Sequence, residues 1–282
     1  MLTQIAIPPY TLSGISVGGV YTALHVPELD ALFDAGQSPR SFVDAGHLFV
    51  SHGHADHVGA LPALLGVRGL AHLSAPRTFL PAEIAHDIAE GVEHFNRGQH
   101  RKIEFPCVPV KSGDDFPLHG DLHVRVFRTL HSVPSVGYLL YRKVEKLRPE
   151  FHALSGSEIL RRKNSGESLF YDVERLELAY ATDTLVDVLD ENPELYRTRT
   201  LILECTFLDD RKSTSDSRKK YHIHLDEILA RAENFQNDHL VLMHFSQSYQ
   251  PRQVHQILKD RLPASLRQRV KVFAPQNGPW PG

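Results

Sequence analysis

The stretch FVSHGHADHVGAL, from Phe49 to Leu61, places three histidines and one aspartate within six positions. The apolar residues that begin it are typical of the end of a buried strand, and the run VGALPALL after His57 is typical of a helix that leaves the strand. The sequence therefore predicts that the cluster lies at a strand-to-helix turn.

This cluster has the residue types and the spacing of a site for two metal ions. His52 and His54 are two positions apart, whereas Asp56 and His57 are adjacent and point to different sides of a turn. Imidazole nitrogen and carboxylate oxygen are ligands that Zn²⁺ accepts at about 2.0–2.2 Å, and two ions about 3.5–4 Å apart can hold both the attacking and the leaving oxygen of a displacement. One short loop can thus contribute ligands to two cations.

Polar residues also follow four other predicted strands. His131 comes after VRVFRTL, Asp183 after LAYAT, Glu204 after TLIL and His244 after HLVLM. A single histidine after a strand is usually structural, but the strand ends of an α/β sandwich converge on one edge. We therefore expect these residues to complete the ligand set of the first loop, with Asp183 as a bridging carboxylate.

Short strand-like runs alternate with helical stretches along the chain, which indicates a layered α/β fold. The predicted strands cover 15–23, 31–34, 48–51, 122–130, 136–141, 178–181, 200–204 and 240–243, and the predicted helices include 81–95 and 225–235. No repeat or long linker divides the 282 residues, so we expect one domain over residues 1–282. The segment 143–174 mixes turn residues with charge and is predicted to be the least structured region, a mobile insert or substrate loop.

Composition excludes several classes of protein. The formal charge of −3 gives no overall attraction to polyanions, so any nucleic-acid contact must come from local basic patches. Cys107 and Cys205 are far apart and lack the spacing of a thiolate zinc site. No apolar run approaches the length of a membrane span, and the N-terminal residues lack a basic signal-like region, so we expect no membrane partner and a soluble, cytoplasmic protein.

Six segments of the chain resemble a known family, the metallo-β-lactamase fold and, within it, tRNase Z, the endonuclease that removes the 3′ trailer of precursor tRNA. These segments are SHGHADHVGALP at 51–62, LFDAG at 32–36, HSVPSVGY at 131–138, ATDT at 181–184, ECTFLDD at 204–210 and HFSQSY at 244–249. The HxHxDH motif alone indicates only the superfamily, whereas HSVPSxGY with ECTF and HFSxxY points to tRNase Z. The pattern is most similar to the short, plant-type members, and it implies an αββα sandwich.

The resemblance also implies how the ligands divide between two zinc ions per chain. It gives two groups that Asp183 joins: His52, His54 and His131 for one ion, and Asp56, His57 and His244 for the other. Asp34, in LFDAG, resembles the family's buried aspartate that supports the first-loop histidines and fixes their tautomers. The alternative is that Asp34 only ends a strand before a turn.

A further histidine is expected to transfer a proton. The segment YHIHLDEIL resembles the tRNase Z segment that supplies a catalytic histidine, but it departs from the usual His-Ser-Thr pattern, so His222 and His224 are both candidates. We favour His222, which lies 22 positions before His244, with Glu204 to orient it. Asp56 would then both bind metal and accept a proton from water, while His222 protonates the departing ribose oxygen. The products would carry a 3′-hydroxyl and a 5′-phosphate.

Precursor tRNA would be held by local positive charge. The basic stretches are 97–102, 143–148, 161–163 and 211–220, and each has a composition that can contact phosphates. Some tRNase Z proteins carry a long arm that holds the tRNA elbow. Between Pro76 and Val108 the sequence shows only a modest helix and a charged turn. Recognition is therefore expected to rely on a shorter surface or on the partner subunit of a homodimer, which the resemblance implies.

Two other functions fit parts of the sequence. One is a phosphodiesterase or other hydrolase of the same fold that acts on a small molecule. The other is a zinc-stabilised RNA-binding or scaffold protein without activity, but a purely structural zinc site is closed and has no use for the extra acid and base that Asp56, Glu204 and His222 provide. The sequence leaves open the native metal, the cleavage position and the treatment of transcripts that carry CCA.

Overall fold

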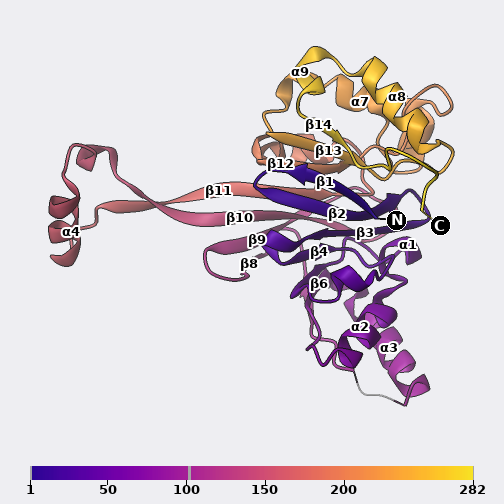
Figure 1. The fold of residues 1–282 in the computed structure, drawn as a ribbon, viewed down its shortest axis with the longest axis horizontal. Coiled ribbons are helices and arrows are strands. Elements are labelled where there is room, and N and C mark those ends of the chain that lie inside the picture. The colour runs from indigo at the N-terminus through magenta and orange to yellow at the C-terminus, as the bar shows by residue number, and fades with distance from the viewer. Residues whose placement is uncertain (1, 101–102, 282) are drawn as a thin grey trace.

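The computed structural model describes residues 2–100 and 103–281. Within these residues, two seven-stranded sheets pack face to face, and helices cover the outer face of each sheet (Figure 1). Helices therefore form the two outer layers and the sheets the two inner ones. This is the αββα sandwich that the sequence predicts.

The first sheet contains the N-terminal strands in chain order. They are β1 Thr3–Ile7, β2 Tyr10–Val17, β3 Tyr21–Val26, β4 Ala31–Phe33, β5 His47–Phe49, β6 Arg77–Pro81 and β7 Cys107–Val110. β1 to β4 pair in antiparallel fashion, and β4 to β7 run parallel. The carboxyl ends of β4 and β5 therefore lie together at one edge of the sheet.

The second sheet contains the remaining strands, again in chain order across the sheet. They are β8 Asp115–Pro117, β9 Leu122–Arg128, β10 Val136–Leu147, β11 Phe170–Ala181, β12 Thr200–Glu204, β13 His239–Met243 and β14 Val270–Val272. β11 to β14 run parallel, and β9 shares their direction because it pairs with β10 in antiparallel fashion. The ends of β9, β11, β12 and β13 consequently lie at the same edge.

The helices are mostly short and connect the strands. They are α1 Ala55–Val58, α2 Leu61–Leu70, α3 Ala82–Gly98, α4 Gly156–Asn164, α5 Val188–Glu191, α6 Thr214–Lys219, α7 Leu225–Leu229, α8 Pro251–Arg261 and α9 Ala264–Arg267. None of the helices in the described part of the chain has both the length and the apolar character that crossing a bilayer requires.

The apolar core is divided into three clusters that correspond to the spaces between the layers. Between the sheets lie the aromatic rings of Phe33, Phe49, Phe79, Tyr138 and Tyr180, all fully buried. A second cluster joins α2 and α3 to the first sheet, and a third joins α5, α7, α8 and α9 to the second sheet. Burial on both faces explains why the parallel strands are continuous apolar runs in the sequence.

Two predicted elements differ from the observed ones. The predicted strand 15–23 is two strands, β2 and β3, because the chain turns at Gly18 and Gly19, and Gly19 has the positive φ of 71° that a glycine adopts readily. The predicted helix 225–235 ends at Leu229 and continues as a 3₁₀ turn over Ala232–Asn234, after which Phe235 is buried.

The largest error concerns the segment 143–174, which was predicted to be the least structured region. The structure instead extends β10 and β11 into a two-stranded ribbon that projects from the body and carries α4 at its end (Figure 1). We call residues 142–175 the arm. Sequence patterns missed it because both faces of the ribbon are in solvent, so its strands lack an apolar face. Whether the arm moves, and whether the chain is one domain, stay predictions.

Candidate metal centre and active site

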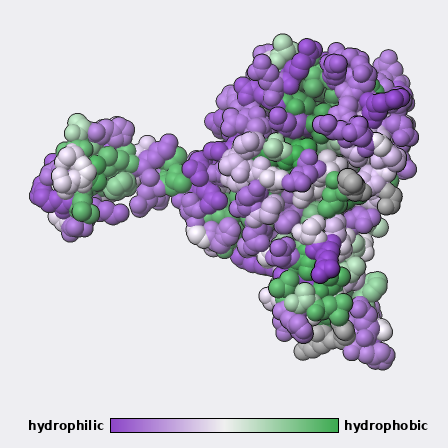
Figure 2. All heavy atoms as spheres, viewed as in Figure 1, coloured by the Kyte–Doolittle hydropathy of each residue, from purple (hydrophilic) through white to green (hydrophobic). Residues whose placement is uncertain are grey.

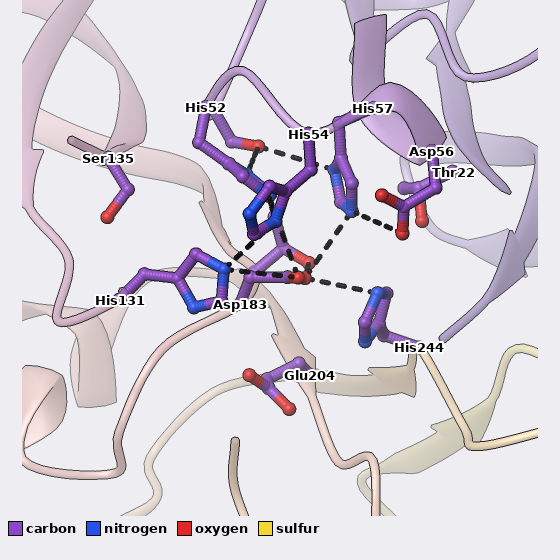
Figure 3. A network of polar contacts seen from close by, with 12 residues as sticks. Thr22, His52, His54, Asp56, His57, His131, Ser135, Asp183, Glu204 and His244 are labelled. Atoms are coloured by element: carbon purple, nitrogen blue, oxygen red, sulfur yellow. Dashed lines mark hydrogen bonds and ion pairs between the residues drawn. The ribbon is translucent and has the colours of Figure 1, made fainter. Parts of the chain in front are cut away.

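The structure brings all seven predicted ligands together at the shared edge of the two sheets (Figure 3). The first loop, between β5 and α2, provides the four residues of the HxHxDH motif. The second sheet provides the other three, since His131 follows β9, Asp183 follows β11 and His244 follows β13. The site therefore lies between the sheets, and neither sheet contains it alone.

Three residues after strand ends have a left-handed backbone. The φ angles are 58° for Asp34, 44° for Asp183 and 59° for His244. Such a conformation costs a non-glycine residue of order 1 kcal/mol and is typical of functional sites, where the surrounding structure holds it. Each of these residues ends its strand sharply, at the edge where the ligands meet.

His52, His54 and His131 form the first ligand group with one oxygen of Asp183. His52 Nε2 lies 3.0 Å from His54 Nδ1, and His131 Nε2 lies 3.3 Å from the same atom. Asp183 Oδ2 lies 3.7 Å from His52 Nε2 and 3.8 Å from His131 Nε2. These four side chains offer ligand atoms that all lie within 4.8 Å of one another.

Asp56, His57 and His244 form the second group with the other oxygen of Asp183. Asp183 Oδ1 lies 3.1 Å from His244 Nε2 and 3.5 Å from His57 Nε2, and Asp56 Oδ2 lies 3.5 Å from His57 Nε2. The two oxygens of Asp183 thus face the two groups separately. This is the arrangement that a bridging carboxylate requires.

The buried Asp34 carboxylate holds the first loop from behind. It accepts hydrogen bonds from Ser51 N at 2.7 Å, from the Tyr180 hydroxyl at 2.5 Å and from His57 Nδ1 at 2.7 Å. The Ser51 hydroxyl also donates to Asp34, at 2.9 Å, and therefore accepts from His52 Nδ1, also at 2.9 Å. Asp34 thereby places a proton on the Nδ1 atoms of His57 and His52.

The Glu204 carboxylate, also fully buried, has the same role on the second sheet. Its Oε2 accepts from the Thr206 hydroxyl at 2.6 Å, and the Thr206 oxygen then accepts from His244 Nδ1 at 3.1 Å. Two backbone amides, of Thr184 and Ile223, donate to the same carboxylate. His244 is therefore also protonated at Nδ1 and presents a bare Nε2 to Asp183.

These tautomers provide a test of whether a metal fits. The Nε2 atoms of His57 and His244 are buried and lack a hydrogen-bond partner within the described residues. Unsatisfied buried polar atoms are costly, and here two of them face the same carboxylate oxygen, Asp183 Oδ1. A bound cation satisfies both nitrogen atoms and the carboxylate, so the donor set fits divalent metal ions.

Charge interactions within the cluster are strong. Burial opposes protonation of His57, but the Asp183 and Asp34 carboxylates outweigh it and raise its pKa to about 9. Burial lowers the pKa of His52, His131 and His244. Burial also opposes the charge of Asp183, yet His244 and His57 hold the pKa of its carboxyl well below the ordinary value. The centre therefore keeps Asp183 ionised and His52, His131 and His244 neutral, the states that bind metal, whereas His57 carries a proton at Nε2 that a metal ion would displace.

His222 and His224 occupy different environments. His222 Nδ1 lies 3.0 Å from Glu204 Oε1, and its ring stacks on His244 with 5.4 Å between ring centroids. Burial opposes its protonation, but Glu204 raises the pKa of His222 to about 9. His224 instead caps α7, since its Nδ1 accepts from Asp226 N at 3.2 Å and its backbone amide donates to Glu227. This geometry favours His222 as the proton donor.

Sequence reasoning missed the residues that carry the tautomer network. Ser51, Thr206 and Tyr180 connect the outer carboxylates to the ligands, yet each looks like an ordinary residue in or after a strand. Gly36, the last residue of LFDAG, is another such position: a Cβ there would lie 1.8 Å from the Asp56 carbonyl oxygen, so only glycine allows the first loop to approach. The one sequence signal for this network is a hydroxyl residue close to a ligand or to its supporting carboxylate, as Ser51 is to His52 and Thr206 is to Glu204.

A comparison with protein-family models supports the class that the fold and the ligand set define. A family described as "Beta-lactamase superfamily domain" matches residues 29–245, which include every predicted ligand. The chain belongs to this superfamily and is a metal-binding protein of the metallo-β-lactamase fold.

Curated relatives define the family more narrowly. The chain is 35% identical to tRNase Z TRZ1 of Arabidopsis thaliana over 94% of its own length and 95% of that protein. It is 34% identical to the chloroplastic tRNase Z TRZ2 of the same plant, over 96% of its own length and 75% of that protein. The chain belongs to the tRNase Z family and is similar to plant members of that family.

Solved structures agree on the fold. The short form of human tRNase Z superposes with a TM-score of 0.58 at 17% identity and covers 93% of this chain and 96% of its own. The metallo-β-lactamase fold protein YhfI of Bacillus subtilis superposes with a TM-score of 0.60 at 15% identity, covering 92% of this chain and 93% of its own. At these identities the likeness establishes the architecture alone.

Proposed function

We propose that this protein is a metal-dependent endoribonuclease that cleaves the 3′ trailer from precursor tRNA and leaves a 3′-hydroxyl and a 5′-phosphate. The tRNase Z relatives support the substrate. The observation that carries the reaction is the Glu204–His222 pair beside the ligand cluster. A centre that only stabilised the fold would have no use for a buried carboxylate that keeps a neighbouring histidine protonated.

The resident metal is proposed to be zinc, with two ions per chain. His52, His54 and His131 would hold one ion, Asp56, His57 and His244 the other, and Asp183 both. Imidazole and carboxylate donors in this number match zinc better than magnesium or calcium, which prefer oxygen. When bound, the ions neutralise charge on the phosphate and lower the pKa of water at the site.

The chain's own residues would move the protons. Asp56, with a side chain that is 16% exposed, is the most accessible carboxylate of the cluster and accepts a proton from the attacking water. The water oxygen bonds to phosphorus as the bond from phosphorus to the ribose O3′ breaks. His222, protonated at neutral pH because of Glu204, gives its proton to that O3′. The reaction uses no 2′-hydroxyl.

The arm is proposed to bind the body of the tRNA. Within the region 76–108, where the sequence shows no long extension, the described residues form β6, α3 and β7. The extension lies instead at residues 142–175. Its tip carries Arg161, Arg162 and Lys163, and Figure 2 shows apolar side chains gathered there, with Leu160 59% exposed.

The predicted basic stretch 97–102 includes residues 101 and 102, which lie outside the described residues.

Three sequence predictions stay proposals. A homodimer and a cytoplasmic location are supported only by the sequence argument, and one relative is named as chloroplastic. The organisation as one domain is supported by the absence of a linker in the sequence and by the apolar cluster between the sheets, to which both sheets contribute.

The function can be tested by incubating purified protein with labelled precursor tRNA and mapping both product ends. We expect a single cut near the 3′ end of the tRNA, a 3′-hydroxyl on the tRNA and a 5′-phosphate on the trailer. An unstructured RNA of equal length should be cut far more slowly. Efficient hydrolysis of a small phosphodiester without cleavage of precursor tRNA would instead favour the small-molecule phosphodiesterase.

A further inference from the structure

A groove lies beside the metal centre, on the side of His131. It has a volume of about 490 Å³ and is lined by Glu83 from α3, by Lys111 and Ser112 after β7, by Arg128 and Thr129 at the end of β9, and by residues 131 and 133–136. His131 is thus shared by the first ligand group and the wall of the groove. Figure 3 shows Ser135, another residue of this wall, beyond His131 and away from His244.

The groove carries positive charge that is available to a ligand. Lys111 and Arg128 are both exposed, and neither forms an ion pair within the described residues. Glu83 is the one acidic residue among those that line the groove, so its charge is positive overall. Two unpaired cations beside a phosphodiester site are suited to bind successive phosphates of a nucleic-acid strand.

The side of the centre next to His222 has a different character. Tyr221 precedes His222 directly, is 40% exposed and lies edge-on to His131 with 6.3 Å between ring centroids. It lines an open hollow with Arg218 and Lys219, but both cations are already paired, Arg218 with Asp187 and Glu227 and Lys219 with Asp216. This side therefore offers an aromatic face, and its positive charge is largely neutralised.

The backbone of Tyr221 strengthens this contrast. Its φ is 60°, a conformation that costs a bulky side chain free energy and that glycine adopts readily. A tyrosine held there keeps an aromatic ring beside the proposed proton donor. Exposed aromatic rings next to single-stranded nucleic acid commonly stack on bases, and stacking tolerates any base.

The chemistry gives the strand a direction. His222 protonates the O3′ of the last tRNA nucleotide, so that nucleotide must lie on the side of His222 and its neighbour Tyr221. The scissile phosphate stays with the trailer as its 5′-phosphate. The trailer is bonded to this phosphorus through O5′, which is not in line with the attacking water, so the trailer extends from the phosphorus in a different direction from O3′. The groove beside His131 carries the positive charge that can bind that chain.

We propose that the RNA crosses the centre with a fixed polarity: the last base of the tRNA stacks on Tyr221, and the single-stranded trailer lies in the groove, where Lys111 and Arg128 bind its phosphates. This inference rests on the proposed function. It assigns the trailer a binding site of its own, separate from the arm that is proposed to hold the tRNA body.

The trailer site can be tested without catalysis. Fluorescence anisotropy would measure how the wild-type metal-loaded protein and a Lys111→Ala/Arg128→Ala variant bind 5′-phosphorylated oligoribonucleotides labelled at the 3′ end. For an oligonucleotide of about eight nucleotides we expect roughly tenfold weaker binding by the variant, and a salt dependence whose slope is smaller by about 1.4, or about 0.7 for each lost phosphate contact. A labelled mononucleotide should bind both proteins alike.

A matched control removes two cations elsewhere. Arg252 and Lys259 on α8 are exposed and unpaired within the described residues, so Arg252→Ala/Lys259→Ala changes the net charge equally and should bind the oligonucleotide as the wild type does. Equal weakening in both double variants would show a general charge effect and overturn the trailer site. An unchanged affinity in the Lys111→Ala/Arg128→Ala variant would overturn it as well.

Cleavage of two precursor tRNAs, with trailers of one and about eight nucleotides, tests the polarity. Tyr221→Gly removes the ring and adopts the positive φ of this position readily. It should lower kcat/KM about 5- to 100-fold, by the same factor for both trailers. Tyr221→Phe keeps an aromatic ring and should retain activity. The Lys111→Ala/Arg128→Ala variant should slow cleavage only of the precursor with the longer trailer. The reverse pattern would overturn the proposed direction. Failure of the wild type to cut either precursor would overturn the proposed function, and the oligonucleotide binding distinguishes the two failures.

Discussion

Strands β10 and β11 belong to two contrasting regions of the molecule, the metal centre and the arm. At the end that reaches the centre, the first six residues of β10 and the last five of β11 are buried, and Asp183 is the second residue after β11. At the other end, the same two strands run through solvent to α4 (Figure 1). One continuous ladder, from the pair Tyr138 and Tyr180 to the pair Leu147 and Phe170, joins the two regions.

The boundary between the regions is a β-bulge. The register of β10 and β11 shifts between Leu140 and Tyr141, which leaves Glu177 as the extra residue on β11. Glu177 is buried and accepts from the Tyr10 hydroxyl at 2.7 Å and from Arg175 Nε at 2.5 Å. Its carboxylate also pairs with Arg142 and Arg199, so the arm begins at a charged junction that is fixed to the body.

The contrast indicates which forces act in each region. In the metal centre, burial makes every unpaired donor or acceptor costly, so outer carboxylates and hydroxyls specify each histidine tautomer. On the arm, exposed ion pairs such as that of Arg161 and Glu158 contribute little each, and the ribbon depends on backbone pairing. Chemistry should therefore depend on the first region and recognition of the tRNA on the second.

Loss of the bridging carboxylate should have the largest effect and should be confined to the centre. Asp183→Asn keeps the shape of the side chain but removes the charge that faces both ligand groups. We expect elemental analysis to fall from about two metal ions per chain to one or fewer, and cleavage to become undetectable, while the affinity for precursor tRNA changes little. Retention of two ions and of cleavage would show that Asp183 does not bridge.

The proton donor should have the next largest effect, and it should depend on the leaving group. A ribose alkoxide needs protonation, whereas nitrophenolate leaves without it, so His222→Ala should slow precursor-tRNA cleavage about 10²–10⁴-fold and hydrolysis of bis(p-nitrophenyl) phosphate much less. His224→Ala is the control, since His224 caps α7 and should lower thermal stability without such a split. A split at His224 instead would reverse the assignment.

Shortening the arm should reverse the pattern expected for Asp183→Asn. Replacing residues 148–169 with a two-residue turn joins Leu147 to Phe170, which already pair across the ribbon. We expect KM for precursor tRNA to rise roughly ten- to a hundredfold through lost phosphate contacts, with metal content and hydrolysis of the nitrophenyl diester unchanged. An unchanged KM would mean that the body alone holds the tRNA.

The smallest effect concerns pH at the tip of the arm. Hydrogen bonds from Arg161 and Arg162 lower the pKa of Glu158 to about 2. Because this pKa lies below that of the unfolded chain, the contribution of Glu158 to the stability of α4 is fully present above the ordinary glutamate pKa of about 4.3 and is lost as the pH falls toward 2. An NMR titration should show α4 fraying over this range, and Glu158→Gln should abolish the dependence. A measured pKa near 4.3 would mean that these exposed pairs contribute nothing.

The sequence by itself determined the layered fold, the ligand types and the strand ends that carry them. These features are local, because a buried parallel strand is a continuous apolar run, and a polar residue within two positions of its end, such as Asp183 or His244, is visible in the sequence. The HxHxDH loop is likewise a set of neighbours along the chain. Spacing therefore sufficed to predict that these residues meet at one edge.

Only the tertiary structure decided the tautomers, the different roles of the two neighbouring histidines and the existence of the arm. Ser51 and Thr206 fix protons only because Asp34 and Glu204, 17 and two positions away in the sequence, lie within hydrogen-bond distance. His222 and His224 differ through Glu204 and through the start of α7. The ribbon of the arm has no apolar face, so its strands are specified by pairing with each other. Pairing between distant segments leaves no periodic signal in either strand.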